Sequence, residues 1–313
     1  MRQAWLFVHF REKKTPDGEQ VHFAVSGDGL RWQALNGGRP VLWSYRGDLG
    51  VRDMCVLRCH DGLFRLFATD LSLAYGMPGK YQGSWDNVAR RGSDCLMCWE
   101  SADLVHWGKQ GELRFPGTGF GCMWAPDCVK NDESGEYLLS WSSTRRGEGK
   151  PHDVWYSLTR DFREWSAPRV LLEGPAIDSA MAREDGVWYL FVKGGTNPAG
   201  VTMLRGESFT GPFLPLQGGV RGLPEAEAAW YEAPAVYRLP DGRWVLMLDY
   251  YGVPGKGQGY VPFLAGTLAD GRFTRAQEGF SFPYGFKHGT VMPITPEEYD
   301  RLLAVGEWPE EGG

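Results

Sequence analysis

One pattern occurs four times in this chain and restricts its fold more than any other feature. Each copy begins with a carboxylate, continues as a short alternating run, turns at a segment that ends in glycine, and closes with a second run of aromatic and aliphatic residues. Alternating runs joined by a tight turn predict a β-hairpin, so an acid opens the first strand of each hairpin. The four acids are Asp53, Asp127, Asp178 and Glu232.

The spacing of these acids indicates a repeated four-stranded unit. They lie 74, 51 and 54 residues apart, and an insertion over residues 75–94 accounts for the longer first interval. A third strand follows each hairpin, and turns with an Asp four residues before a Trp recur at residues 28–32, 103–107 and 161–165. A unit of about fifty residues with four strands is typical of a propeller blade, whose first strand lines the central channel. We therefore expect the four acids to meet on one axis.

A fifth blade can be assembled from both ends of the chain. His288 lies 56 residues after Glu232 and opens a further strand, after which the chain nearly ends. The unassigned strands over residues 4–10 and 20–26 can complete that blade, and closure removes an exposed sheet edge. We predict an all-β fold, a five-bladed β-propeller over residues 1–313 as a single domain, with the last blade formed by the N-terminal strands plus the His288 strand.

Composition agrees with this fold and excludes some partners. The 42% hydrophobic content allows a large core, and 43 Gly, 20 Pro and 14 Trp suit short strands joined by tight turns. A net charge of −6 argues against nucleic-acid and anionic-membrane partners. No segment approaches the roughly 20 apolar residues of a membrane span. The apolar N-terminus is short and has no cleavage site of small residues, which favours a cytoplasmic protein.

The six cysteines do not predict a metal site. Cys95 and Cys98 have the spacing of a ligand pair, but the segment reads as a strand, which sends these two side chains to opposite faces. Cys122 and Cys128 flank the start of a hairpin and have no matching ligand pair. We expect buried free thiols and no bound metal.

Several carboxylates that face one channel suggest a catalytic site. Such groups repel each other and shift their pKa values, an arrangement that is common at active sites. Glycoside hydrolysis needs two of them, one acid and one base or nucleophile. Trp124, Trp230 and Tyr231 stand beside the acids in the sequence and have the flat apolar surfaces on which sugar rings stack.

At these residues the chain resembles the five-bladed propeller glycosidases of glycoside hydrolase family 43, which include α-L-arabinofuranosidases, β-xylosidases and arabinanases. The resemblance covers nearly the whole chain. It implies that Asp53 matches the general base of the first blade, that Asp178, in Ile-Asp-Ser, matches the group that modulates the pKa of the acid, and that Glu232, in Glu-Ala-Pro, matches the general acid. Asp127, in Trp-Ala-Pro-Asp, matches an acid of the second blade, and His288 matches the channel histidine of the fifth.

The mechanism that the resemblance implies is single-step hydrolysis with inversion. Asp53 takes a proton from water, Glu232 protonates the leaving oxygen, and Asp178 keeps Glu232 protonated. The carboxyls of Asp53 and Glu232 are then expected roughly 6.5–9.5 Å apart, whereas about 5 Å indicates retention. Met54 and Ser179 stand where the family often has proline. Their presence loosens the start of each strand in this interpretation, but it leaves both carboxylates in place.

The expected substrate-binding residues are Arg52, Trp124, Asp127, Arg183, Tyr231 and His288. Some of them have a second interpretation: Asp127 as a structural acid, His288 as a core histidine, and the two arginines as partners of the channel acids. The insertion over residues 75–94 either forms a wall of the pocket or is a solvated loop.

Together these patterns predict an exo-acting glycoside hydrolase that releases a pentose, α-L-arabinofuranose, from plant-derived oligosaccharides. The alternatives are a β-D-xylosidase, a carbohydrate-binding propeller that has lost catalysis, and a glycoside phosphorylase. The last requires a cluster of cations around the channel. No cofactor is required in this interpretation, and an ion or ordered water near His288 stays open.

Overall fold

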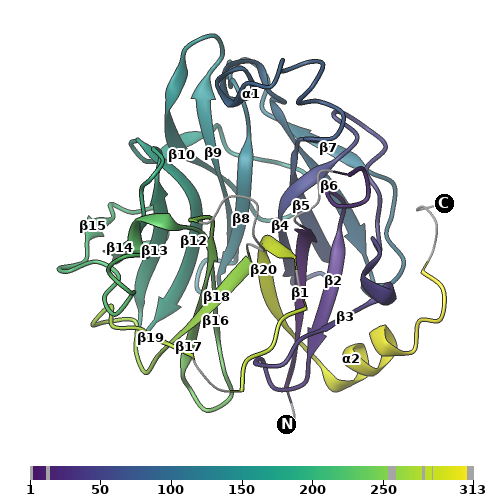
Figure 1. The fold of residues 1–313 in the computed structure, drawn as a ribbon, viewed down its shortest axis with the longest axis vertical. Coiled ribbons are helices and arrows are strands. Elements are labelled where there is room, and N and C mark those ends of the chain that lie inside the picture. Colours follow the sequence, from purple (N-terminus) through teal and green to yellow (C-terminus); the bar gives the residue numbers. More distant parts are fainter. Residues whose placement is uncertain (1–2, 12–14, 253–258, 277–278, 284, 309–313) are drawn as a thin grey trace.

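The computed structural model describes residues 3–11, 15–252, 259–276, 279–283 and 285–308, which form five four-stranded antiparallel sheets arranged in a ring (Figure 1). Blade 1 contains β4 (Val51–Arg58), β5 (Phe64–Asp70), β6 (Cys95–Ser101) and β7 (Gly111–Arg114). Blade 2 contains β8 (Trp124–Asn131), β9 (Glu136–Arg145), β10 (Gly149–Thr159) and β11 (Arg169–Leu172). Blade 3 contains β12 (Ala176–Glu184), β13 (Val187–Gly194), β14 (Val201–Gly206) and β15 (Leu214–Pro215). Blade 4 contains β16 (Tyr231–Arg238), β17 (Trp244–Tyr250), β18 (Gly259–Ala265) and β19 (Thr274–Arg275).

Blade 5 joins the two ends of the described chain. It has the order β20 (Phe286–Ile294), β1 (Ala4–Arg11), β2 (His22–Ser26) and β3 (Gln33–Ala34). The pairing of β20 with β1 is antiparallel and sets Leu6 opposite Met292. The inner strands β4, β8, β12, β16 and β20 each contact the next around the ring, and β20 contacts both β16 and β4. The predicted five-bladed β-propeller and its closure by the N-terminal strands are therefore confirmed.

Few helices accompany the sheets in the described part of the chain. The α-helices are α1 (Trp85–Arg91), in the insertion, and α2 (Pro296–Leu303). Short 3₁₀ turns occur at Asn36–Gly38 and Ala228–Trp230. Helix α2 begins with a capping box in which Thr295 and Glu298 bond each other's backbone amides. Neither α-helix has the length and apolar character that a membrane span requires.

The hydrophobic core is divided among the spaces between neighbouring blades. The middle strands are apolar on both faces, so successive residues serve different cores: Leu6 packs toward blade 1, and Phe7 toward blade 4. Five clusters of this kind fill the five spaces around the ring. A sixth, with Leu71, Tyr81 and Val88, anchors the insertion. The cysteines are free thiols, mostly buried in these clusters, as predicted.

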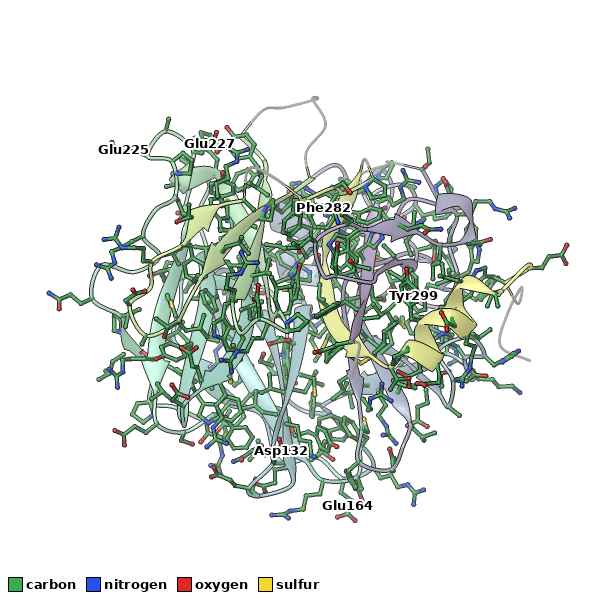
Figure 2. All side chains as sticks on the ribbon, turned by 90° about the horizontal axis from the view of Figure 1, so that it is seen from below. Asp132, Glu164, Glu225, Glu227, Phe282 and Tyr299 are labelled. Carbon is green, nitrogen blue, oxygen red and sulfur yellow. The ribbon has the colours of Figure 1, made fainter. Side chains whose placement is uncertain are left out.

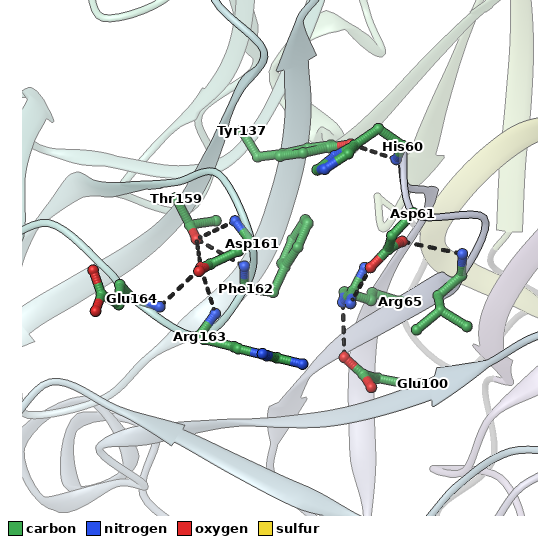
Figure 3. Close-up of polar contacts among 11 residues, drawn as sticks. His60, Asp61, Arg65, Glu100, Tyr137, Thr159, Asp161, Phe162, Arg163 and Glu164 are labelled. Carbon is green, nitrogen blue, oxygen red and sulfur yellow. Dashed lines mark hydrogen bonds and ion pairs between the residues drawn. The ribbon is translucent and has the colours of Figure 1, made fainter.

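The recurring Asp-to-Trp turns attach one blade to the next. In blade 2, Asp161 Oδ1 accepts hydrogen bonds from the amides of Arg163 (2.9 Å) and Glu164 (3.0 Å), as Figure 3 shows. This turn presents Phe162 to Arg65 of blade 1, whose guanidinium lies 4.3 Å from the ring centre. Arg65 is itself fixed by Asp61 and Glu100 (Figure 3). The repeated spacing of the turn therefore serves blade packing.

The ring has two distinct rims. Figure 2 shows Asp132 and Glu164 on the opposite side of the molecule from Glu225 and Glu227. Asp132 belongs to the β8–β9 turn, whereas Glu227 lies just before the start of β16. The starts of the inner strands, where the sequence predicts a site, are therefore on the rim that carries Glu227.

Candidate functional site

A pocket of about 470 Å³ occupies the rim at which the inner strands begin. Asp53, Asp178 and Glu232 line it together, from blades 1, 3 and 4. Trp124 of blade 2 and His288 of blade 5 also line it, so every blade contributes. The volume is that of a small-ligand site.

A β-bulge in each inner strand shapes this pocket. The pairing register shifts after Arg52, Trp124, Ile177 and Glu232, and also between Phe286 and Gly289. In the first four blades the next residue has a left-handed backbone, with φ between 49° and 54°: Asp53, Ala125, Asp178 and Ala233. Bulges re-aim side chains, and here they direct successive residues of a strand into the same hollow.

The four acids do not occupy equivalent positions, which differs from the expectation that they open their strands in the same way. Asp53 and Asp178 are the bulge residues themselves, Glu232 stands one residue before the bulge residue of its strand, and Asp127 stands two residues after Ala125. Met54 and Ser179 leave the bulge conformation unchanged, because the same φ occurs where proline follows Ala125 and Ala233.

Asp53 is held by two hydrogen bonds. Its Oδ2 accepts from Thr69 Oγ1 at 2.9 Å, and its Oδ1 lies 3.2 Å from His288 Nδ1. Burial acts to raise the pKa of Asp53, but His288, Arg52 and Thr69 together lower it below its ordinary value. Burial likewise acts to lower the pKa of His288, and the nearby carboxylates, Asp53 foremost, raise it. These two residues therefore favour an ionised pair.

The pKa values of Glu232 and Asp178, by contrast, are raised. Burial, then the charges of Asp249 and Asp178, raise the pKa of Glu232 to about 7. Burial and the charge of Asp53 raise the pKa of Asp178, against the opposing effects of His288 and Lys193. The Ala233 amide hydrogen-bonds Asp178, which ties it to the residue that follows Glu232. The pocket thus contains an ionised carboxylate, Asp53, and a carboxylic acid, Glu232, whose raised pKa lets it keep its proton near neutral pH.

Aromatic and cationic side chains form the wall on the side of blades 1 and 2. Arg52 pairs with the buried Glu19 at 3.3 Å and lies over the rings of Phe10 (4.5 Å) and Trp85 (5.7 Å). Trp124 packs against His152, with ring centres 4.7 Å apart. The insertion contributes to this wall through Trp85 of α1, a half-exposed residue that lines the pocket.

Sequence analysis missed a second set of pocket residues, which lie on the middle strands. Thr69, Lys193 and Asp249 line the pocket and pair across the sheet with Arg52, Ile177 and Glu232. Each is a polar residue near the end of an otherwise apolar strand, and this is the signal that could have identified them. Lys193 Nζ donates to the carbonyls of Gly194 and Thr196 and to Asn197 Oδ1. Four more polar or aromatic lining residues that sequence analysis missed lie outside the middle strands: Asn197, Tyr251, Lys287 and His152.

Three of the predicted substrate-binding residues lie outside this pocket. Asp127 lines a separate channel cavity of about 130 Å³ and accepts a hydrogen bond from the Met181 amide, because it stands beyond the bulge. Tyr231 is fully buried, because strand alternation turns it away from the side to which Glu232 points, and it bonds Glu227. Arg183 lies at the far end of β12 and pairs with Glu133. These three predicted residues therefore do not line the pocket that holds Asp53, Asp178 and Glu232.

The prediction of an ion or ordered water near His288 stays open. Among the described residues, no group of three or more His, Cys, Asp or Glu side chains is arranged to hold a metal ion. The His288 ring contacts Asp53 through Nδ1.

Comparisons with known proteins agree with this geometry. A family model of the group Glyco_hydro_43_rel, described as "probable glycosyl hydrolase domain", matches residues 1–300. An α-L-arabinofuranosidase of Bifidobacterium longum subsp. longum is 26% identical over 206 residues, which are 58% of this chain but only 19% of that protein.

Two solved structures share the fold. A xylan β-1,4-xylosidase from Bacillus halodurans C-125 has a TM-score of 0.58 at 18% identity, covering 84% of this chain and 51% of that one. An exo-β-1,3-galactanase from Phanerochaete chrysosporium, with β-1,3-galactotriose, has a TM-score of 0.63 at 11% identity, covering 92% and 64%. With a family model that spans nearly its whole length, the chain belongs to glycoside hydrolase family 43, in its group of related domains.

Proposed function

We propose that this protein is an exo-acting glycoside hydrolase that releases a pentose, α-L-arabinofuranose, from plant-derived oligosaccharides with inversion of configuration. The observation that carries the proposal is the split in protonation between Asp53, whose pKa is lowered, and Glu232, whose pKa is raised to about 7. Pairs of titratable groups whose pKa values are pushed apart identify the base and the acid of a site.

In the proposed reaction Asp53 acts as the general base. It removes a proton from a water molecule as the water oxygen attacks the anomeric carbon. Glu232 donates its proton to the glycosidic oxygen as the bond to the anomeric carbon breaks. The products are the pentose, with inverted configuration, and the shortened oligosaccharide. Asp178 raises the pKa of Glu232 by its charge and holds the adjoining backbone through the Ala233 amide.

The shape of the pocket supports action at a chain end. A separate cavity of about 130 Å³, lined mainly by apolar side chains and thiols, lies farther along the inner strands. A pocket that is distinct from this cavity accepts a terminal sugar more readily than a chain threaded through the channel. The similarity to the Bifidobacterium longum arabinofuranosidase supports arabinofuranose as that sugar.

A phosphorolytic reaction is a weaker candidate, although the pocket does contain cations. Arg52, Lys193 and Lys287 line it, which is the kind of cluster that phosphate binding requires. Each already has protein partners: Arg52 bonds Glu19, Lys193 bonds carbonyls and Asn197, and Lys287 bonds Asp249. Hydrolysis is therefore favoured, and turnover that depends on added inorganic phosphate would reverse this preference.

The experiment that tests the proposal compares aryl glycosides and follows the product by ¹H NMR. We expect turnover of 4-nitrophenyl α-L-arabinofuranoside in preference to the β-D-xyloside and β-D-galactoside, with β-arabinofuranose released first. Asp53→Asn should lower kcat by about 10²–10⁴-fold on every substrate. Glu232→Gln should lower kcat by a similar factor on oligosaccharides. It should lower kcat much less on a 2,4-dinitrophenyl glycoside, because that leaving group departs without being protonated.

Asp132→Asn is the matched control, because Asp132 is exposed on the opposite rim (Figure 2). Preference for the xyloside would replace arabinose by xylose in the proposal. Release of the α-anomer would contradict inversion. Full activity of Asp53→Asn would remove the proposed base.

A further inference from the structure

Asp249 and Lys287 form a buried ion pair in the pocket wall. Asp249 Oδ2 lies 2.5 Å from Lys287 Nζ, and the two side chains are 1% and 8% exposed. Both line the pocket, one from the middle strand of blade 4 and the other from the inner strand of blade 5. Removing two charges from water costs more than their attraction returns in many proteins, so such a pair is poorly explained by stability alone.

The ion pair lies next to both proposed catalytic residues, Glu232 and Asp53. Asp249 is the cross-strand partner of Glu232 in the pairing of β16 with β17, and such partners have Cβ atoms about 4.5–5.5 Å apart. Lys287 directly precedes His288, which contacts Asp53. A sugar held between Asp53 and Glu232 therefore lies against this pair.

One oxygen of the pair is left without a partner. Asp249 Oδ1 is buried, and no hydrogen-bond donor among the described residues reaches it. An ionised carboxylate accepts several hydrogen bonds, and a buried acceptor without one is costly. In a pocket that binds sugars, the donor that would satisfy this oxygen is a hydroxyl group.

We propose that Asp249 is a substrate-binding residue, whose Oδ1 accepts a hydrogen bond from a hydroxyl of the sugar bound beside Glu232. Lys287 pairs with the other oxygen, Oδ2, and so fixes the orientation of the carboxylate. This inference rests on the proposed function. The proposal makes Asp249 a determinant of substrate specificity. A site that is built to hydrogen-bond a sugar hydroxyl discriminates strongly against the analogue that lacks that hydroxyl.

A double-mutant cycle between Asp249 and the sugar hydroxyls tests the proposal. Wild type and Asp249→Asn are assayed on the aryl arabinofuranoside and on its 2-, 3- and 5-deoxy analogues. We expect Asp249→Asn to lower kcat/KM about 10- to 100-fold on the parent sugar, because Lys287 holds the one amide oxygen and an NH2 donor takes the place of the acceptor Oδ1. On one deoxy analogue, already a poor substrate for wild type, the substitution should cost almost nothing more. Lys287→Gln should show the same coupling, more weakly.

Equal losses for Asp249→Asn on all four sugars would overturn the proposal and reduce Asp249 to a modulator of Glu232. Circular dichroism melting checks that each variant folds, and Asp249→Ser is the second variant if asparagine does not. If wild type cleaves another aryl glycoside instead, the arabinose assignment fails and the cycle is run on that sugar. If it cleaves none, calorimetric affinities for arabinose, xylose and galactose that Asp249→Asn leaves unchanged would overturn the proposal.

Discussion

Asp178 influences Glu232 through charge and through the backbone. It is among the groups that raise the pKa of Glu232, after burial and Asp249, and the Ala233 amide connects it to the strand that carries the acid. As the proposed general acid, Glu232 must be protonated to act, so activity should fall as pH rises through its pKa of about 7. As the proposed general base, Asp53 must be ionised, so activity should fall only when pH drops below the lowered pKa of that carboxylate.

The substitution Asp178→Asn tests whether the charge of Asp178 acts on Glu232. Removing the negative charge lowers the pKa of Glu232, so the alkaline limb of the kcat/KM profile should move to lower pH, by about one unit. The acid limb, set by Asp53, should move less. The measurement is kcat/KM against pH on an aryl glycoside, with Asp132→Asn as control. An alkaline limb that stays in place or moves upward would contradict the proposed role.

The inner strand of blade 5 depends on one glycine at its bulge. Gly289 pairs with His9, and a Cβ added at Gly289 would lie 1.8 Å from the carbonyl oxygen of Val8. That oxygen belongs to the backbone and cannot rotate away. The close approach of β20 to β1 therefore fixes the position of Lys287 and His288.

We expect Gly289→Ala to destabilise the protein by about 3 kcal/mol or more, at the upper end of overpacking effects, because β20 must separate from β1. Gly266→Ala is the matched control, since nothing lies within 4 Å of the added Cβ there. Urea unfolding of both variants gives the comparison. Equal midpoints would show that β20 tolerates displacement and that the closing blade is not tightly paired.

Local signals in the sequence were enough to locate the inner strands but not the bulges in them. Turn glycines and alternation are set by nearby residues, so the strand that starts near Asp178 could be predicted. The left-handed backbone at Ala125 and Ala233 is imposed by the ring, and alanine gives no indication of it. Without the bulges, Asp127 looked equivalent to Asp53, although it lies in a different cavity.

At the scale of the whole molecule, placing acids around one axis makes stability depend on pH. Burial raises the pKa of Asp127 to about 6, against the hydrogen bonds from the Met181 and Cys128 amides. A folded-state pKa above the unfolded value of 3.8 means that this group stabilises the fold fully only below about pH 3.8. That contribution is lost as pH rises through 6.

Asp127→Asn should remove this dependence, because asparagine cannot ionise and its amide oxygen can still accept the hydrogen bond from Met181. Relative to wild type, the variant should gain about 2–3 kcal/mol in free energy of unfolding between pH 4 and pH 7. Urea unfolding at both pH values provides the measurement, with Asp132→Asn as the exposed control. A constant difference between variant and wild type would mean that channel water solvates Asp127 as well as bulk water does. Unchanged kcat/KM would in addition separate Asp127 from the sugar-binding pocket, because its carboxylate faces the lower cavity and not the sugar.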